Sequence, residues 1–338
     1  MIETAVVILN YNGKKFLQQF LPGVIAHSGT AKIIVADNAS TDDSINFLKE
    51  NFHSQVEIIQ LETNRGYCGG YNAALNQVKA RYYVLLNSDV EVTPGWIDPV
   101  IELFKQDASC AAAQPKILSY HKKDEFEYAG AAGGFIDTFG YPFCRGRIFN
   151  TLEKDHGQYN DTRPIFWATG ACLFIRSEVF HQHHGFDEDF FAHMEEIDLC
   201  WRIQRTGMKI FYTGKAHVFH VGGGTLAKSN PRKTYFNFRN GLSLLIKNLP
   251  TTQLIWKIPV RLVLDWLAAF RFLLKGLPAD AGAVLRAHVK FIFNLRRDYQ
   301  KRDKAQPYKG KIKTIYRGLL LAGYLAGKRH FSDFRVED

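Results

Sequence analysis

Four short apolar runs alternate with segments of helical period over the first ninety residues of the chain. The runs are rich in β-branched residues and cover residues 4–9, 32–36, 56–61 and 82–86. Between them, residues 42–52 and 70–79 repeat their apolar positions at helical spacing. Strands that alternate with helices in this way form a parallel sheet with helices on its faces. We therefore predict an α/β fold with a mostly parallel sheet flanked by helices.

The 338 residues are enough for one large domain and an appendage, because 46% of them are hydrophobic. The pattern becomes continuously helical from about residue 253, so we place a domain division near residue 245. The five cysteines are widely spaced and contain no CxxC pair. This spacing argues against a disulfide framework or a structural zinc site and favours the cytosol.

The C-terminal region carries most of the positive charge. Residues 286–317 hold eleven Lys or Arg and two Asp, and the formal charge of the whole chain is +10. Aromatic and aliphatic residues are interleaved with basic ones, and no apolar stretch approaches the ~18 residues of a spanning helix. Such helices either lie on an anionic membrane surface or pack on the core with a solvated charged face, and the sequence leaves both open.

Polar residues follow each of the four predicted strands. They are Asn10, Tyr11 and Asn12, then Asp37 and Asn38, then Asn64, Arg65 and Gly66, and then Asn87, Ser88 and Asp89. Ligands of parallel sheets bind beyond the carboxyl ends of the strands, so these residues predict a binding site at one sheet edge.

Three of these positions indicate a phosphate-bearing ligand. Asp89 ends a buried strand and is our candidate ligand for a hard divalent cation, although an isolated Asp there is often a turn or helix cap. Asp37 can accept hydrogen bonds from a ribose or base. Arg65 lies in a glycine-rich turn before a helix, where backbone amides favour an anion.

A group of carboxylates opens a later predicted helix. Glu195, Glu196 and Asp198 fall within four positions, and adjacent side chains on a helix point in different directions. One carboxylate can therefore face a cleft and act as a general base. The alternative is that these residues only complement the helix dipole.

Two further stretches could contact a sugar. Gly170 and Ala171 allow close approach of a ligand to the backbone, and Trp167 could stack on a sugar ring, although a packed strand crossing explains them equally well. We assign Trp167 and Trp201 to the acceptor side. His220 follows a strand-like segment and is a possible second metal ligand.

Together these motifs resemble the family-2 inverting glycosyltransferases with the GT-A fold, especially their bacterial rhamnosyltransferase-like branch. The resemblance covers about residues 5–249. It is carried by residues 6–13, 37–42, 64–66, 85–89, 169–171, 185–188 and 195–202, in that order.

The resemblance implies a GT-A, Rossmann-like catalytic domain over residues 1–245, with a nucleotide-binding half to about 118 and an acceptor-side half over 119–245. Residues 246–338 form the basic amphipathic helical region. The nucleotide-sugar-binding residues would be Asn10, Tyr11, Asn12, Asp37, Asn64, Arg65, Gly66, Asn72, Asn87, Ser88, Gly170 and Ala171.

The resemblance also implies a DxD-type metal motif that ends at Asp89, with His220 as a later ligand of Mg²⁺ or Mn²⁺. Asn87 stands where a strict DxD motif has Asp, which leaves fewer charged ligands. Glu196 occupies the position of the general base, with Glu195 as a substitute and Asp198 in the same catalytic group. The chain has Glu-Glu where many relatives have Glu-Asp.

The expected reaction moves a sugar from a nucleotide-diphosphate donor, dTDP-rhamnose first and UDP-sugars next, to a hydroxyl of a glycan or lipid-linked acceptor. This would serve cell-surface polysaccharide synthesis at the inner face of the cytoplasmic membrane. A nucleotidyltransferase would carry a glycine- and Lys/Arg-rich loop where this chain has Asn10, Tyr11 and Asn12. A nucleic-acid-binding protein has only charge in its support, and we expect no nucleic acid partner.

Overall fold

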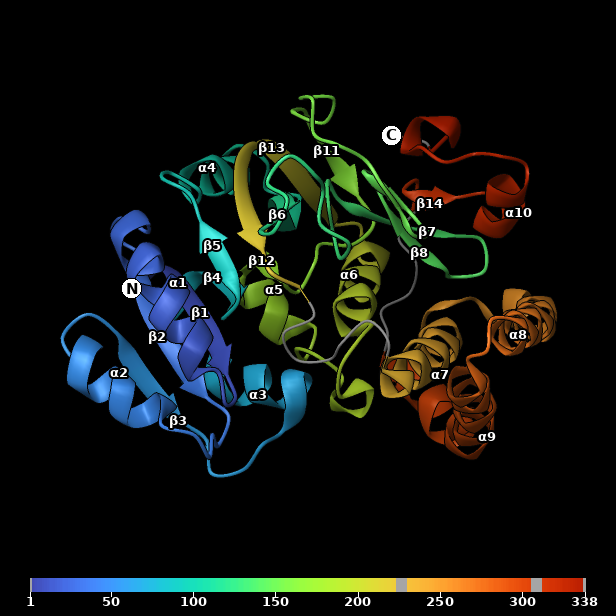
Figure 1. The fold of residues 1–338 in the computed structure, drawn as a ribbon, viewed down its shortest axis with the longest axis horizontal. Coiled ribbons are helices and arrows are strands. Elements are labelled where there is room, and N and C mark those ends of the chain that lie inside the picture. Colours follow the sequence, from blue (N-terminus) through green and yellow to red (C-terminus); the bar gives the residue numbers. More distant parts are fainter. Residues whose placement is uncertain (1, 223–229, 305–311, 337–338) are drawn as a thin grey trace.

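The computed structural model describes residues 2–222, 230–304 and 312–336, which form two β-sheets with flanking helices. Four parallel strands open the larger sheet (Figure 1). They are β1 (Ile2–Asn10), β2 (Lys32–Asp37), β3 (Glu57–Gln60) and β4 (Ala80–Asn87), joined by α1 (Lys14–His27), α2 (Ser44–Phe52) and α3 (Gly66–Leu75). The predicted α/β fold is confirmed.

The rest of this sheet is mixed. Among the described residues it has nine strands, in the order β11-β13-β6-β12-β4-β1-β2-β3, with β5 paired to β13. The added elements are β5 (Val90–Val92), α4 (Asp98–Gln106), β6 (Cys110–Ser119), β11 (Thr162–Ile165), β12 (Cys172–Arg176), α5 (Ser177–Gln182), α6 (Glu195–Arg205) and β13 (Lys209–His220). β12 runs antiparallel to both β4 and β6, so the parallel order ends next to β4.

Both faces of the larger sheet are covered. Val6 and Ile8 of β1 face a core made with α1, α2 and α4, while Ala5 and Val7 face a core made with α3, α5 and α6. Because both faces of β1 are buried at its centre, its side chains are apolar without interruption from Ala5 to Leu9.

A second sheet occupies part of the stretch 119–166, where the sequence predicts loops or a small β-excursion. Its order is β10-β9-β8-β7-β14. The strands are β7 (Gly134–Asp137), β8 (Pro142–Cys144), β9 (Arg147–Ile148), β10 (Thr151–Leu152) and β14 (Ile315–Tyr316). The C-terminal segment, with α10 (Leu320–Leu325) and η3 (Phe331–Asp333), returns to this sheet, where the Phe331 ring lies 5.0 Å from that of Phe135.

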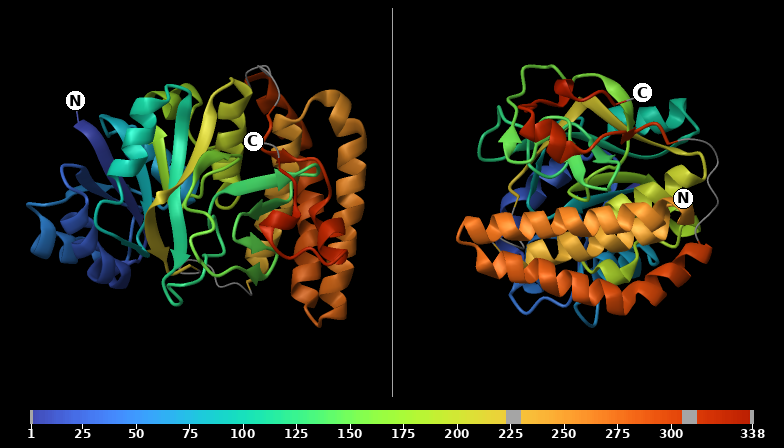
Figure 2. Two further views of the ribbon diagram at one scale, coloured as in Figure 1. Left: turned by 90° about the horizontal axis from the view of Figure 1, so that it is seen from above. Right: turned by 90° about the vertical axis from the view of Figure 1, so that its right-hand side faces the viewer.

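Three long helices form a layer on one side of the molecule. α7 (Pro231–Asn248) packs against α6 and against α8 (Thr251–Leu274) and α9 (Pro278–Gln300). Figure 2 shows α8 and α9 running antiparallel across the outside of this layer. The predicted division near residue 245 falls in the last turn of α7. No helix in the described ranges is long and apolar enough to cross a bilayer.

Candidate active site

The register of the parallel strands brings their polar ends together. Asn10 is paired with Asp37, and Leu9 with Asn87. The side-chain amide of Asn10 donates to Asp37 Oδ1 at 2.9 Å, and Ser40 donates to the same carboxylate through its hydroxyl at 2.6 Å. Asp37 is 3% exposed, so its carboxylate fixes the loop after β2.

Tyr11 and Asn12, the two residues that follow β1, differ in exposure and in hydrogen bonding. Asn12 has a positive φ of 52°, and its Oδ1 accepts from the amide of Thr41 at 2.7 Å, which ties the β1 loop to the β2 loop. Tyr11, in contrast, is 47% exposed at the same sheet edge. Its ring is available to a ligand, whereas Asn12 has a structural partner.

The turn before α3 is shaped by its own side chains. Asn64 Oδ1 accepts from the amide of Gly66 at 2.9 Å. Gly66 has φ +67°, and a Cβ there would lie 2.8 Å from the Phe191 ring, so this position requires glycine. Arg65 lies at the surface and pairs with Glu188 at 3.2 Å.

Asn72 does not join the sheet edge. Its Nδ2 donates to the carbonyl of Phe186 at 2.8 Å, and its Oδ1 accepts from the Phe186 amide at 2.9 Å. Both ends of its amide are thus used by the protein backbone. The assignment of Asn72 to nucleotide-sugar binding stays a prediction that these contacts do not support.

Asn87, Asp89 and His220 meet at the end of β4. His220 Nε2 lies 3.2 Å from Asp89 Oδ1 and 3.5 Å from Asn87 Nδ2. Strand pairing explains this meeting, because His220 at the end of β13 is paired with Val90 of β5. Ser88 lies between the two strand-end residues and is partly exposed.

Glu127 is a site residue that sequence reasoning missed. Its Oε2 lies 3.6 Å from His220 Nδ1, and both side chains are buried. Burial disfavours charge on His220, but Asp89 and Glu127 outweigh it and raise the pKa of His220 to about 10. Glu127 lies in the stretch 119–166, whose weak periodicity and lack of a motif gave no signal.

The donor set at this strand end fits a divalent cation. The Asp89 carboxylate and the His220 imidazole, 3.2 Å apart, are donor types that would hold such an ion. Asp89 and Glu127 raise the pKa of His220 because they attract its positive charge. The same carboxylates would attract a metal ion, which would replace the proton on His220. The described residues contain no metal-binding group of three His, Cys, Asp or Glu, so the other ligands would be Asn87, water or donor phosphate.

Glu195 and Glu196 begin α6 after a strained loop. Phe191, His193 and Met194 all have positive φ values, from 64° to 72°. Glu195 is 5% exposed and Glu196 is partly exposed, and each has an oxygen without a hydrogen-bond partner. Burial raises the pKa of Glu196 to about 7, and burial together with the charge of Glu196 raises the pKa of Glu195 well above its ordinary value.

Tyr67 interacts with Gly170 through its hydroxyl and with the charges of Glu195 and Glu196. Its hydroxyl donates to the carbonyl of Gly170 at 2.8 Å, and the amide of Asn87 donates to the carbonyl of Ala171 at 3.0 Å. Burial raises the pKa of Tyr67 well above its ordinary value, and the nearby charges of Glu195 and Glu196 add to this. Gly170 and Ala171 therefore lie between the β4 end and the start of α6.

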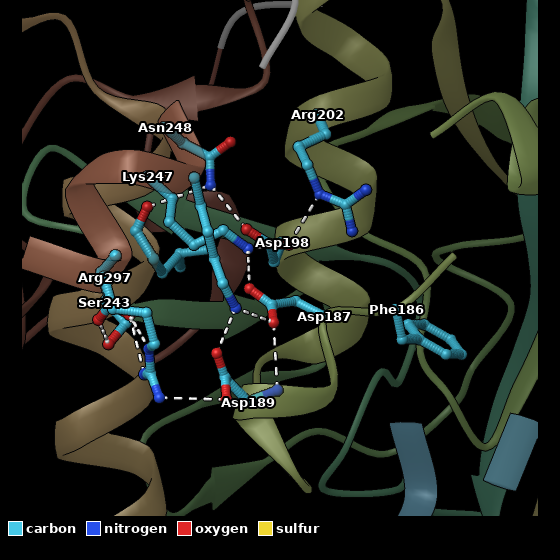
Figure 3. Close-up of polar contacts among 12 residues, drawn as sticks. Phe186, Asp187, Asp189, Asp198, Arg202, Ser243, Lys247, Asn248 and Arg297 are labelled. Atoms are coloured by element: carbon cyan, nitrogen blue, oxygen red, sulfur yellow. Dashed lines mark hydrogen bonds and ion pairs between the residues drawn. The ribbon is translucent and has the colours of Figure 1, made fainter. Parts of the chain in front are cut away.

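Asp198 has a structural role. Lys247 and Arg202 each contact its Oδ2 at 2.8 Å, and Asn248 donates to its Oδ1 at 2.9 Å (Figure 3). Burial would raise the pKa of Asp198, but the two cations hold it below its ordinary value. With both oxygens engaged by other side chains, Asp198 anchors α6 in this structure, and its assignment to the catalytic group stays a prediction.

The two tryptophans assigned to the acceptor side are buried. Trp201 is 1% exposed and packs edge-on against Phe166, 5.3 Å between ring centroids. Trp167 is 4% exposed, and its Nε1 donates to the carbonyl of Phe135 at 3.0 Å. Both indoles are packed inside the protein in this structure, and their assignment to the acceptor side stays a prediction.

The parallel half-sheet with its polar strand ends is the arrangement of the GT-A fold, and solved structures share this fold. GalNAc-T7 with UDP, GalNAc and Mn²⁺ superposes with a TM-score of 0.59 at 14% identity, over 88% of this chain and 58% of that one. A mannosyltransferase of Pyrobaculum calidifontis with GDP-Man and Mn²⁺ gives a TM-score of 0.53 at 13% identity, over 86% and 87%.

The family follows from the sequence. The model of the family described as "Glycosyl transferase family 2" matches residues 5–183, which is more than half of the chain. The protein therefore belongs to this family, and it is a glycosyltransferase enzyme. This membership decides against the nucleotidyltransferase and nucleic-acid-binding alternatives.

Relatives at modest identity include rhamnosyltransferases. The N-acetylglucosaminyl-diphospho-decaprenol L-rhamnosyltransferase of Mycobacterium tuberculosis is 26% identical over 318 residues, covering 88% of this chain and 96% of the relative. Rhamnosyltransferase WbbL of Escherichia coli K12 is 25% identical over 225 residues, covering 64% and 82%. This chain is thus rhamnosyltransferase-like.

Proposed function

We propose that the protein is an inverting glycosyltransferase that moves a sugar from a nucleotide-diphosphate donor to a hydroxyl of a lipid-linked glycan. The observation that carries this proposal is the pair of polar centres at the end of β4 and at the start of α6. Asp89 and His220 lie at the end of β4, and Glu196 with a raised pKa opens α6. One centre suits the diphosphate that leaves, and the other suits the hydroxyl that attacks.

Glu196 would act as the general base. Its free oxygen and a pKa of about 7 allow it to accept a proton near neutral pH. The acceptor oxygen attacks C1 as it loses its proton to Glu196, and the C1–O bond to the diphosphate breaks. A single displacement of this kind inverts the anomeric carbon without a covalent enzyme intermediate.

The strand ends would bind the donor. Tyr11 is exposed and can stack on the base, while Asp37 shapes the loop around the ribose. Arg65 and the N-terminus of α3 favour the phosphates. Mg²⁺ or Mn²⁺ would be held by Asp89 and His220 beside Asn87, where it supplies Lewis-acid neutralisation of the diphosphate charge.

Rhamnose is the proposed donor sugar, as dTDP-rhamnose, with UDP-sugars next. The names of the two rhamnosyltransferase relatives support this choice. The decaprenol-linked acceptor in the name of the mycobacterial relative supports a lipid-linked acceptor here. We place the reaction in cell-envelope polysaccharide synthesis at the inner face of the cytoplasmic membrane, with α8 and α9 against anionic lipid.

The stereochemistry of transfer tests this function. The protein would be incubated with dTDP-rhamnose, Mg²⁺ and a short-chain lipid diphosphate that carries N-acetylglucosamine, and the new linkage would be read by NMR coupling at C1. We expect a product of anomeric configuration opposite to the donor. A product that retains the donor configuration would rule out the single displacement and the Glu196 base.

A further inference from the structure

The outer faces of α8 and α9 expose a large apolar surface. On α8 the exposed side chains include Ile255, Val263, Leu267, Phe270 and Leu274, and on α9 they include Ile292 and Phe293, with exposed fractions from 56% to 80%. The two helices form the outside of the helical layer, as the right-hand view of Figure 2 shows. Contiguous apolar surface of this extent marks an interaction site.

A groove of about 760 Å³ lies between α7 and α9 at the edge of this surface. Arg232 lies on its α7 side, and Arg286 and Lys290 lie on its α9 side. Its apolar lining includes Phe236 and Val289, and it reaches Phe293, which is 80% exposed. The groove therefore combines a cationic part with an apolar part that opens on the outer face.

The cations of this groove have no carboxylate partners. Across the described part of the chain, Arg232, Arg286 and Lys290 form no ion pair, whereas Arg297 on the same helix pairs with Asp189 at 3.1 Å. Arg286 and Lys290 are one helical turn apart on α9 and are exposed. Three unneutralised cations around one hollow favour a phosphate-bearing ligand.

The inner end of the groove contacts the loop over residues 191–194 that leads into α6, here called the catalytic loop. The Arg232 guanidinium lies 5.5 Å above the rings of both Phe191 and Phe236, and these two rings stack at 5.6 Å. The ring of His193, two residues before Glu195, lies 6.4 Å from that of Phe236. A ligand in the groove would therefore end next to the loop that leads into α6, the helix that carries the proposed base.

We propose that this groove binds the diphosphate and the first part of the hydrocarbon chain of a lipid-diphosphate-linked acceptor. The phosphates would contact Arg232, Arg286 and Lys290, and the chain would pass over Val289 and Phe293 to the bilayer beside α9. The sugar attached to the diphosphate then lies at the catalytic loop. This inference rests on the proposed transfer to a lipid-linked glycan and adds the site that recognises the carrier.

Two double variants of the full-length protein test the groove. Arg286→Ala with Lys290→Ala removes two groove cations, and Arg271→Ala with Lys275→Ala removes two exposed cations of the same helical layer outside the groove. Binding of geranylgeranyl diphosphate in non-ionic detergent would be measured by calorimetry. We expect the groove pair to weaken binding by about tenfold or more, because each charge-assisted hydrogen bond contributes substantially. The control pair should bind as the unmodified protein does.

Three results would overturn the proposal. The first is that both double variants bind the lipid diphosphate equally weakly, and the second is that the protein binds inorganic diphosphate as tightly as the lipid. The third is that the groove variant loses binding to phosphatidylglycerol vesicles but not to the lipid diphosphate. The first and third indicate general attraction to anionic lipid, and the second indicates an anion site without a lipid component. Melting temperatures of both variants check folding.

Donor turnover by the unmodified protein separates this inference from the proposed function. One result is that the unmodified protein turns over no nucleotide sugar, while the groove variant alone binds the lipid diphosphate more weakly. The groove proposal then stands and the proposed transfer reaction is wrong. If donor turnover is present and the groove pair binds the lipid normally, the groove falls and the transfer reaction stands.

Discussion

Glu195 and Glu196 begin the same helix but lie in different surroundings. Glu195 is 5% exposed, while Glu196 reaches the surface and its pKa is raised to about 7 by burial. A general base must be ionised to accept a proton, and a pKa of about 7 leaves Glu196 partly ionised at neutral pH, with its partnerless Oε2 buried. The pKa of Glu195 is also raised well above its ordinary value, by burial first and then by the charge of Glu196.

This difference predicts the pH dependence of transfer. Because the ionised fraction of Glu196 grows as pH rises through its pKa, kcat should rise between about pH 6 and about pH 8. Glu196→Gln should lower kcat by about a hundredfold or more, whereas the surface control Glu50→Gln should not change it. A flat profile, or a larger loss in Glu195→Gln, would move the base to another residue.

Glu127 lies beside His220 of the proposed metal site, with its Oε2 3.6 Å from the second ring nitrogen. A carboxylate on the second ring nitrogen orients an imidazole ligand, and losing such a partner weakens metal binding by about ten- to a hundredfold. We therefore expect Glu127→Gln to weaken Mn²⁺ binding, measured by calorimetry, while the neighbouring Glu125→Gln does not. Unchanged Mn²⁺ affinity in Glu127→Gln would separate this carboxylate from the metal site.

The sequence could place the polar residues of β1, β2 and β4 at one edge, because parallel strands end together. It could not place Glu127, which no motif marks and which reaches His220 only through the folding of the second sheet region. The sequence also does not show that the polar atoms of Asn72 and Asp198 form hydrogen bonds and ion pairs with other groups of the protein.

At the scale of elements, α6 is held in place by the helical layer. Lys247 of α7 contacts Asp187 at 2.6 Å and Asp198 at 2.8 Å, and Lys301 also pairs with Asp187 (Figure 3). These charges are almost fully buried, so each depends on its partners. The start of α6, with Glu195, is thus positioned from the C-terminal side of the chain.

Removing the central cation tests this anchoring. Lys247→Met would leave the buried carboxylates of Asp187 and Asp198 short of a partner, and we expect a loss of about 3 to 5 kcal/mol in the free energy of unfolding. Urea unfolding monitored by tryptophan fluorescence measures it, with the exposed Lys275→Met as control. If both variants unfold at the same urea concentration, the cluster does not hold α6.

Long periodic elements were predictable, since β1 to β4 and α8 and α9 carry repeated apolar positions. The individual strands of the second sheet could not be located from the sequence, because strands such as β9 and β14 have only two residues and no measurable period. Trp201 illustrates a related limit: the sequence places it on α6 but does not tell which face of α6 is buried.

At the scale of the whole molecule, the helical layer gives the protein an apolar and basic side. Exposed Phe270 and Leu274 lie on α8 near Arg271 and Lys275, as expected of a helix that rests on an anionic bilayer. This supports a membrane-facing orientation in which the groove and the catalytic loop are both reached from the lipid side.

Vesicle binding tests this orientation. The protein should sediment with vesicles that contain phosphatidylglycerol, less so at high salt because the charges are screened. Phe270→Ser with Leu274→Ser should reduce sedimentation severalfold, since it removes apolar surface from the proposed contact. Leu325→Ser on α10, 73% exposed, is the matched control. Equal sedimentation of all three proteins would place the membrane contact elsewhere.

The central claim is metal-assisted transfer from a nucleotide sugar, and release of nucleoside diphosphate tests it most directly. The purified protein would be incubated with a panel of nucleotide sugars and Mg²⁺ or Mn²⁺, beside Asp89→Ala and Glu196→Gln. We expect release from one donor, dTDP-rhamnose first, that requires the cation and is lost in Asp89→Ala. Release that is unaffected by metal removal and by Asp89→Ala would contradict the account.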